Sequence, residues 1–429
     1  MRYAEPGFNL EIDLTRGNIE KVATDPKDTE KYLGGLGTNA KIMWDRVGPE
    51  IEAFSPENLL IFATGLLCGT PAIGCNRTIV TTISPQTKLM HFSMMGGFWA
   101  PELKHAGFDK VILRGKSPDL VYIWINNDKV EICDASHLKG KGSNETAELI
   151  RKELNEPKAQ VAAIGLAGEN RVFFASIEQG RSSASRGGIG AVMGDKGVKA
   201  IVVRGTNDVH VAQPVEYLEQ CNEVMEYIKF REDHPIPGVI PILSVLGSPQ
   251  EMMIHDEKWH TENFSWGNSR VRRRDFWNDE IAAEWMDTLD NARTRMISCY
   301  NCPVKCGATL NMPGVSTYMM KCFTKLTYTM AAFSNLDFGL TIAQKATEYG
   351  VDGYSAPQVM AFALELLEDG ILSDSDFEGM PEKSEERFYW MLDKIVRREG
   401  IGDILADGTH WAAEKIGNGA EKYAHNNIK

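Results

Sequence analysis

The 429-residue sequence has no long apolar run, few cysteines and no excess of basic residues. Its most apolar stretch, residues 59–74, contains three glycines and is shorter than the roughly 20 residues that a membrane helix needs. No charged N-terminal region followed by an apolar segment opens the chain, so we find no secretion signal. We therefore expect a cytoplasmic protein without a membrane span.

Charge and cysteine content narrow the possible partners. The chain carries 46 Lys and Arg against 59 Asp and Glu, a formal net charge of -13. This balance argues against a broad nucleic-acid-binding surface. In a reducing compartment the eight cysteines are expected to be thiols or metal ligands rather than disulfides.

An ordered set of short motifs occurs twice in the first half of the chain, and such self-similarity indicates an internal repeat. Gly-Leu, Asn-Arg, Gly-Gly and a β-rich segment ending in Arg-Gly appear in the same order in both copies. The first copy has Gly65-Leu66, Asn76-Arg77, Gly96-Gly97 and residues 111–115, and the second has Gly165-Leu166, Asn170-Arg171, Gly187-Gly188 and residues 201–205. We expect two related halves with pseudo-two-fold symmetry.

The hydrophobic pattern predicts an α+β protein with two domains. Apolar residues alternate before and after turns at residues 10–22 and 121–132, which predicts β-hairpins. Helical stretches are expected at residues 29–46 and 144–154. From Pro214 onward the period becomes helical. The prediction is a mainly β, duplicated domain over residues 1–209 and a mainly α-helical domain over residues 210–429.

Two glycine-rich loops carry nearby arginines and suit an anionic ligand. Glycine lets the backbone approach an anion, and guanidinium groups bind phosphate oxygens. The candidates are Gly96 and Gly97 with Arg77, and Gly187 and Gly188 with Arg186. Taken one at a time, such glycines more often serve only a tight turn. Their occurrence in both copies favours two equivalent anionic groups, or one ligand with two-fold shape.

Three cysteines lie within eight residues in the second half. Cys299, Cys302 and Cys306 have the spacing Cys-x2-Cys-x3-Cys, which can wrap one face of an iron–sulfur cluster. Zinc is the main alternative, but it would need further ligands, and only Cys322 is nearby. We expect three of the four ligands of a [4Fe-4S] cluster here.

A second polar group contains Glu251, His255, Glu257 and His260. Two imidazoles and two carboxylates can tune one another's pKa and act as acid, base or proton relay. A solvated polar helix is an equally good interpretation of the pattern. The spacing differs from the His-Glu-x-x-His of zinc proteases.

The sequence resembles the aldehyde:ferredoxin oxidoreductase family of tungsten enzymes over essentially its whole length. The resemblance is carried by residues 96–104, 106–109, 186–194 and 199–203 together with the three clustered cysteines. It implies a tungsten bis-pyranopterin cofactor cradled by the β domain, with a magnesium ion bridging the pterin phosphates. A family loop, Asp-x-x-Gly-Leu-Asp, corresponds to residues 347–352, where Gly350 and Asp352 match and Thr347 does not.

Within that family the chain is most similar to the tungsten subunits of class II benzoyl-CoA reductases, through residues 34–39, 90–101, 251–260 and 319–328. This resemblance implies that Cys322 is a thiolate ligand of tungsten and that His260, with Glu251, His255 and Glu257, supplies protons. The implied reaction is a two-electron reduction of benzoyl-CoA to a cyclic dienoyl-CoA. An iron–sulfur electron-transfer subunit is the implied partner.

Three alternatives follow from the same resemblance. The family pattern continues into a third domain with a fourth cluster ligand, neither of which we find in this sequence. This predicts a fragment, a truncated product, or a split enzyme whose second chain completes the site. An aldehyde oxidoreductase and an inactive remnant are the alternative functions. Ligand types do not distinguish tungsten from molybdenum.

Overall fold

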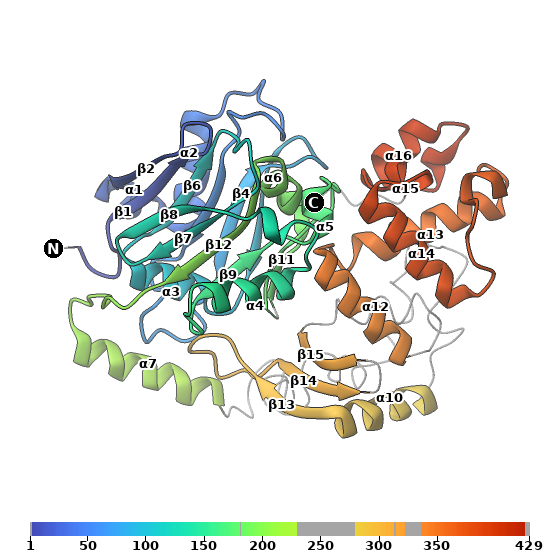
Figure 1. Ribbon diagram of the computed structural model, residues 1–429. Coiled ribbons are helices and arrows are strands. Elements are labelled where there is room, and N and C mark those ends of the chain that lie inside the picture. The colour runs from blue at the N-terminus through green and yellow to red at the C-terminus, as the bar shows by residue number, and fades with distance from the viewer. Residues whose placement is uncertain (1, 181, 230–278, 313–314, 322–335, 425–429) are drawn as a thin grey trace.

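The computed structural model describes residues 2–180, 182–229, 279–312, 315–321 and 336–424. The first half of the chain forms two six-stranded sheets, and most of the helices of the second half stand beside them (Figure 1). The first half is thus a mixed α/β region rather than a mainly β one, since helices accompany both sheets.

The first sheet has the strand order β2-β1-β6-β3-β4-β5. Only β1 and β6 are parallel, and every other neighbouring pair is antiparallel. The central strands are almost continuously apolar and buried on both faces, as expected for strands covered on both sides. The bounds are β1 Phe8–Asp13, β2 Asn18–Ala23, β3 Leu60–Thr64, β4 Thr78–Ile83, β5 Met90–Met95 and β6 Lys110–Arg114.

The second sheet has the order β11-β10-β9-β12-β7-β8. Again one pair, β7 and β12, is parallel, and the others are antiparallel. The bounds are β7 Val121–Asn126, β8 Lys129–Asp134, β9 Gln160–Ala163, β10 Ile177–Gln179, β11 Ser182–Ala184 and β12 Val198–Arg204. The two predicted hairpins are therefore confirmed as β1–β2 and β7–β8.

The two sheets share strand order and strand direction element by element. Each begins with a hairpin, places its sixth strand parallel to its first, and continues through its third, fourth and fifth strands. The register also matches at one buried position. The Thr64 amide donates to the Asp109 carbonyl, and the Ile164 amide donates to the Lys199 carbonyl, both at 3.0 Å. The duplicated origin of the halves remains a prediction, but their topology is the same.

Equivalent buried positions carry opposite charges. Asp109 is paired with Lys104 at 2.8 Å, and Lys199 is paired with Glu169, all four residues being largely removed from water. The two halves thus share a backbone arrangement but differ in the sign of the buried charge at this position.

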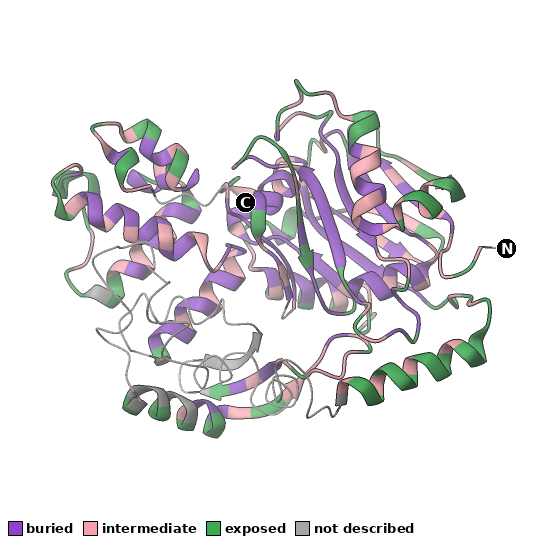
Figure 2. Cartoon of the chain, turned by 180° about the vertical axis from the view of Figure 1, so that it is seen from behind, coloured by how far each residue is buried: buried purple, intermediate pink, exposed green. Residues whose placement is uncertain are grey.

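Two helices lie between the sheets, α3 (Trp99–Ala106) and α6 (Ile189–Asp195). Each contacts strands of both sheets, and their side chains share one apolar cluster with those strands. Trp99 is fully buried, and its indole N–H donates to the Ile201 carbonyl on β12 at 3.0 Å. Figure 2 shows this buried interior running through the strands. One core therefore unites both halves.

The single helical stretch predicted at residues 29–46 is wrong. The chain forms two helices, α1 (Pro26–Tyr32) and α2 (Gly35–Arg46). Leu33 ends α1 in a left-handed conformation with φ +60°, and Gly34 follows with φ +78°. The adjacent glycines make the reversal possible, because glycine adopts positive φ readily. The second predicted helix is α4 (Ser143–Glu153).

The second half is mostly helical, with helices α7 (Pro214–Lys229), α10 (Asp279–Ala292), α12 (Leu336–Tyr349), α13 (Ser355–Glu368), α14 (Ser384–Arg397), α15 (Ile401–Leu405) and α16 (Gly408–Ile416). The apolar faces of α12 to α16 share one core, which also includes Val172 and Phe174 from the first half. The predicted boundary at residue 209 falls between β12 and α7.

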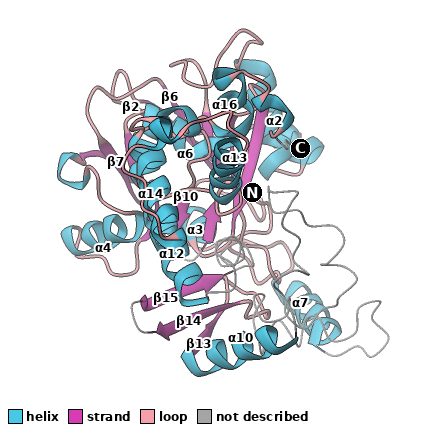
Figure 3. Ribbon diagram, turned by 90° about the vertical axis from the view of Figure 1, so that its right-hand side faces the viewer, coloured by secondary structure: helices cyan, strands magenta, loops and turns pink. Residues whose placement is uncertain are grey.

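A small antiparallel sheet stands within this helical half, with the order β13-β14-β15 (Figure 3). Its strands are β13 (Arg293–Ile297), β14 (Gly307–Met312) and β15 (Val315–Lys321). The sequence analysis did not predict it, because these short strands lack a clear alternation of apolar and polar residues. The cysteine-bearing residues 299–306 form the loop that joins β13 to β14.

Among the helices of the described residues, none is both long and apolar enough to cross a membrane.

Candidate functional site

A cavity of about 360 Å³ opens where the edge strands of the two sheets meet. Strand β5 supplies one wall and residues of and after β11 supply another, with a third contribution from the helical half. It brings together three residues predicted from sequence, Arg77, Arg186 and Asp352. The other lining residues are Phe92, Ser93, Met94, Ser183, Ser185 and Tyr354.

Arg186 is held at the cavity by contacts with three residues, two of them in the segment between α12 and α13 and one on β5. Its guanidinium lies 3.2 Å from Asp352 Oδ2 and stacks over the Tyr354 ring, 4.7 Å from the centroid. Its backbone N–H donates to Ser93 Oγ on β5 at 3.2 Å. Half of its side chain stays exposed (51%). The guanidinium is thus fixed in place yet retains N–H donors for a ligand.

The Asp352 carboxylate is hydrogen-bonded through one of its two oxygens. It is 1% exposed. Its Oδ2 accepts hydrogen bonds from Arg186 and from the backbone and hydroxyl of Ser355. Its Oδ1 is buried and accepts no hydrogen bond from the described residues. A buried acceptor without a donor costs about 1–3 kcal/mol, so a ligand N–H at this atom would be favourable.

The loop with Gly187 and Gly188 turns from β11 into α6 through two left-handed residues, with φ +73° and +65°. A Cβ on Gly187 would lie 2.1 Å from the His91 ring, and one on Gly188 would lie 2.1 Å from the Phe173 carbonyl. Burial lowers the pKa of His91, and the nearby Arg186 guanidinium lowers it further. A neutral imidazole therefore packs against this loop near pH 7, and both glycines are required by close approach.

Gly97 links the turn between β5 and α3 to the cysteine loop and is not among the residues that line the cavity. It has φ +114°, and a Cβ there would meet Gln179 Oε1 at 1.9 Å. Its carbonyl accepts the backbone N–H of Tyr300 at 3.2 Å. Gly96, which precedes it, is buried but is not among the lining residues.

The cysteine loop is fastened to the first half of the chain by residues between its cysteines. The Tyr300 carbonyl accepts from Asn76 Nδ2 at 2.9 Å, and the Asn301 carbonyl accepts from the Gly74 amide at 2.9 Å. The Asn301 side chain donates to the carbonyls of Pro71 and Ala72. Asn76 therefore holds the cysteine loop, while the adjacent Arg77 lines the cavity.

The cysteine side chains are close in sequence and partly protected from water. Cys299 is 9% exposed, and Cys302 and Cys306 are half-buried. Across the described ranges, no group of three or more His, Cys, Asp or Glu side chains is arranged to hold a metal ion. The three thiols belong to one loop, and their donor chemistry suits iron.

Gly350 and Asp352 lie where the helical half meets the second sheet. The Gly350 carbonyl accepts from the Ser176 amide at 2.8 Å, and the Asp352 amide donates to the Phe174 carbonyl at 2.9 Å. A Cβ on Gly350, which has φ +71°, would lie 2.8 Å from the Gly165 nitrogen. Gly350 thus allows two backbones to approach and so places Asp352 at the cavity.

Five predicted functional residues lie outside the described part of the chain, namely Glu251, His255, Glu257, His260 and Cys322. Conversely, sequence reasoning missed the hydroxyl residues of the cavity wall. Ser183 and Ser185 stand just before Arg186, and that proximity was the only indication available from sequence.

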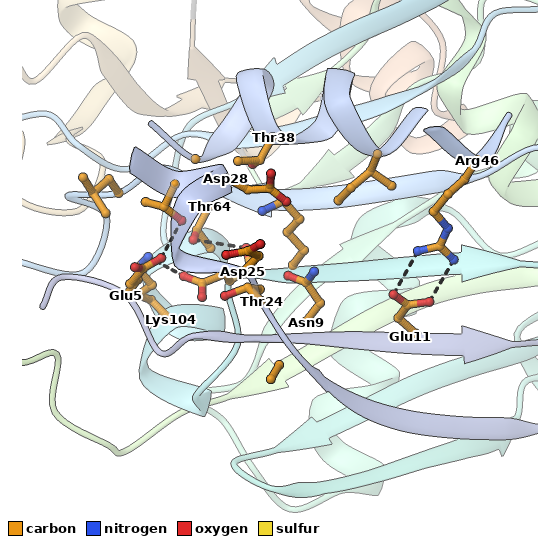
Figure 4. Close-up of a pocket in the computed structure, with 17 residues that line it drawn as sticks. Glu5, Asn9, Glu11, Thr24, Asp25, Asp28, Thr38, Arg46, Thr64 and Lys104 are labelled. Carbon is orange, nitrogen blue, oxygen red and sulfur yellow. Dashed lines mark hydrogen bonds and ion pairs between the residues drawn. The ribbon is translucent and has the colours of Figure 1, made fainter. Parts of the chain in front are cut away.

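A second, smaller cavity of about 160 Å³ lies between β1, α1 and α2 and contains none of the predicted site residues. Figure 4 shows Glu11 paired with Arg46 at one end, and Glu5, Thr24, Asp25 and Lys104 toward the other. Lys110 and Asn9, paired in register on β6 and β1, also line it and are 5% and 8% exposed. In the second sheet the matching positions, Ala200 and Tyr122, belong to a packed apolar cluster.

Comparison with known proteins identifies the family. The profile described as aldehyde ferredoxin oxidoreductase, N-terminal domain, matches residues 9–205, and the profile for domains 2 and 3 of the same family matches residues 224–429. The chain belongs to the aldehyde ferredoxin oxidoreductase family. The resemblance inferred from sequence is therefore confirmed.

Two curated relatives come from archaea. A tungsten-containing aldehyde ferredoxin oxidoreductase of Pyrococcus horikoshii is 36% identical over 429 residues, covering 97% of this chain and 68% of the relative. The WOR-like subunit of an aliphatic sulfonate oxidoreductase of Pyrococcus furiosus is 32% identical over 445 residues, covering 96% and 68%. The family includes tungsten-containing oxidoreductases.

A solved structure is more similar. It is described as the active-site complex BamBC of benzoyl coenzyme A reductase in complex with 1,5-dienoyl-CoA. One of its chains is 78% identical to this chain and superposes with a TM-score of 0.94. The match covers 100% of this chain and 66% of that chain, so this chain spans just under two thirds of its length.

Proposed function

We propose that this chain is the catalytic tungsten subunit of a benzoyl-CoA reductase, which reduces the aromatic ring of benzoyl-CoA by two electrons to a cyclic dienoyl-CoA. The observation that carries the proposal is the 78% identity to a chain of a solved benzoyl-CoA reductase complex that contains the dienoyl-CoA. The test is anaerobic turnover of benzoyl-CoA with a low-potential donor. A protein with full metal content and no ring reduction would contradict it.

We propose that the cavity between the sheets binds the tungsten bis-pyranopterin. The orphaned Asp352 Oδ1 suits an N–H group of a pterin. Arg77 and Arg186 line the cavity and suit its phosphate. A magnesium ion would bridge the phosphates of the two pterins. When bound, the metal and its pterins supply the low-potential electron transfer to the ring.

The protein's own side chains would bind and orient the cofactor and would protonate the reduced ring. Arg186, fixed by Asp352 and Tyr354, would hold an anionic group without having to reorganise. We propose that His260 donates a proton to the reduced ring, with Glu251, His255 and Glu257 tuning its basicity. Cys322 is proposed as a thiolate ligand of the tungsten. Its replacement by Ala should abolish ring reduction without lowering the iron content.

We also propose that Cys299, Cys302 and Cys306 provide three thiolates to a [4Fe-4S] cluster, with the fourth ligand from elsewhere. The hydrogen bonds that join their loop to Gly97 and Asn76 support this, because Asn76 directly precedes the cavity residue Arg77. An iron–sulfur electron-transfer subunit and an aromatic acyl-CoA are the proposed partners. The complex with CoA product in the solved relative supports both a second subunit and the substrate class.

An aldehyde oxidoreductase is the second candidate, favoured by the tungsten-containing aldehyde ferredoxin oxidoreductases at 33–36% identity. Assaying benzaldehyde beside benzoyl-CoA separates the two activities. If protein purified without oxygen held neither tungsten nor iron, an inactive remnant would be the better description.

We further propose that the two sheets arose by duplication, each half cradling one pterin. Their shared strand order and directions support this. A cytoplasmic location also remains a proposal.

A further inference from the structure

A chain of hydrogen-bonded side chains runs from a buried carboxylate to the wall of the larger cavity. Glu178 lies on β10 and is 3% exposed. Its Oε1 accepts the Ser183 hydroxyl at 2.7 Å, and Ser183 Oγ lies 2.6 Å from Ser185 Oγ. Both serines line the cavity. The chain therefore connects the interior of the second sheet to the surface that a ligand would touch.

The direction of these hydrogen bonds is fixed by proton count. A serine hydroxyl has one proton to donate and two lone pairs that accept. Ser183 gives its proton to Glu178, so in its contact with Ser185 it must accept. Ser185 then uses its own proton inside the chain and has only lone pairs left to offer. At the cavity wall, Ser185 is an acceptor and not a donor.

The cavity thus presents both hydrogen-bond acceptors and cationic donors to a ligand. Ser185 Oγ and the unpartnered Asp352 Oδ1 are acceptors. Arg77 and Arg186 are cationic donors. A matching ligand carries N–H groups on one edge and an anionic group elsewhere, which describes a pterin phosphate. A bare anion would satisfy the arginines alone.

We propose that Glu178, acting through Ser183, holds Ser185 as a hydrogen-bond acceptor for an N–H group of the pterin. Glu178 and Ser183 are then positioning residues for the cofactor, and Ser185 is a direct contact. The inference rests on the proposed function, since it assumes a pterin in this cavity.

A second serine that donates to the Glu178 carboxylate provides a matched control. Ser176 is fully buried and donates to the same Glu178 Oε1 at 2.6 Å, but it does not line the cavity. Ser176→Ala removes a hydrogen bond of the same type and leaves the chain to the cavity intact. Ser183→Thr restores a hydroxyl at the middle of the chain, and β-branched residues suit its strand position.

The experiment measures pterin retained by the full chain. Wild type and variants are purified without oxygen from a host that makes the tungsten pterin, then dialysed, and pterin per chain is read from fluorescence after oxidative release. Ser185→Ala and Ser183→Ala should retain about 5- to 10-fold less pterin than wild type, the effect of losing one hydrogen bond. Ser176→Ala and Ser183→Thr should retain wild-type amounts.

The contrary outcomes are distinct. Wild type without pterin would overturn the proposed function and this inference together. Wild type with pterin, retained equally by Ser183→Ala and Ser185→Ala, would overturn this inference alone. A loss in Ser176→Ala as large as that in Ser183→Ala would also overturn it, because packing around Glu178 would then explain the effect.

Discussion

The backbone N–H of Tyr300 donates to the carbonyl of Gly97 at 3.2 Å, so the cysteine loop is hydrogen-bonded to the turn between β5 and α3. Tyr300 stands between Cys299 and Cys302, and its ring also packs edge-on against Phe98. Position and packing of the cysteines therefore depend on the conformation of the loop before α3. A substitution at Gly97 is therefore expected to affect the cysteine loop as well.

Gly97→Ala should lower both pterin and iron content. The added Cβ would meet Gln179 Oε1 at 1.9 Å, and φ +114° is unfavourable for any residue with a Cβ. Gly17→Ala is the control, because Gly17 has φ +68° but nothing within 4 Å of an added Cβ. Metal analysis and pterin fluorescence of both variants check the prediction. Equal cofactor content in the two variants would mean that the Gly97 contact is dispensable.

His91→Ala should rescue Gly187→Ala but not Gly188→Ala. The Cβ on Gly187 would collide with the His91 ring, which truncation removes, whereas the Cβ on Gly188 would collide with the Phe173 backbone carbonyl. Overpacking of this kind costs about 1–3 kcal/mol, and positive φ adds strain that no truncation relieves. Denaturant unfolding of the single and double variants measures the rescue. An equal effect of His91→Ala on both glycine variants would rule out the ring contact as the cause.

Cys302→Ser should lower the iron content of the anaerobic protein, because a serine hydroxyl is a poorer ligand for iron than a thiolate. Cys133→Ser, in the hairpin strand β8, should leave iron unchanged. Measuring zinc on the same samples decides between the two metals. If Cys302→Ser lowered the zinc content and left the iron content unchanged, the three cysteines would belong to a zinc site and not to an iron–sulfur cluster.

Lys110→Met should stabilise the protein near neutral pH. Burial lowers the pKa of Lys110 from 10.5 to about 8, although Asp109 acts in the opposite direction. The unfolded chain therefore binds this proton more tightly. The folded state carries the full penalty below about pH 8, and the penalty disappears as pH rises from about 8 to 10.5. A shift of this size corresponds to roughly 3 kcal/mol at most.

The measurement is the free energy of unfolding of wild type and Lys110→Met at pH 7 and pH 10. The gain from the substitution should be larger at pH 7 than at pH 10. Lys129→Met, at an exposed lysine, provides the comparison and should show no such difference. A constant gain across the two pH values would point to added apolar packing instead.

Much of the fold could be predicted from local pattern, but the site could not. The hairpins at β1–β2 and β7–β8 follow from alternation and turn residues, which act over a few positions. The break at Leu33 does not follow from local pattern, because the residues on both sides of it have helical propensity. Arg77, Arg186 and Asp352 come from three distant segments. The glycine-rich motifs indicate the two arginines, and only the family resemblance adds Asp352.

The hydroxyls of Ser183 and Ser185 illustrate the remaining gap. Serine occurs in turns, strands and sites alike, so its presence says little about its role. Their importance depends on Glu178, which is paired with Ser183 only after β10 and β11 form their antiparallel ladder. Such a contact is a property of tertiary structure and has no counterpart in a linear motif.

The inverted charges at Asp109 and Lys199 bear on how a chain with two sheets of the same topology avoids misassembly during folding. A strand of one half could in principle insert into the other sheet, since the strand orders are the same. An exchange of β6 and β12 would place Asp109 beside Glu169, and Lys199 beside Lys104. Each mismatch would bury like charges, and loss of a buried pair costs roughly 3–5 kcal/mol. The two ion pairs would therefore disfavour such an exchange of strands during folding.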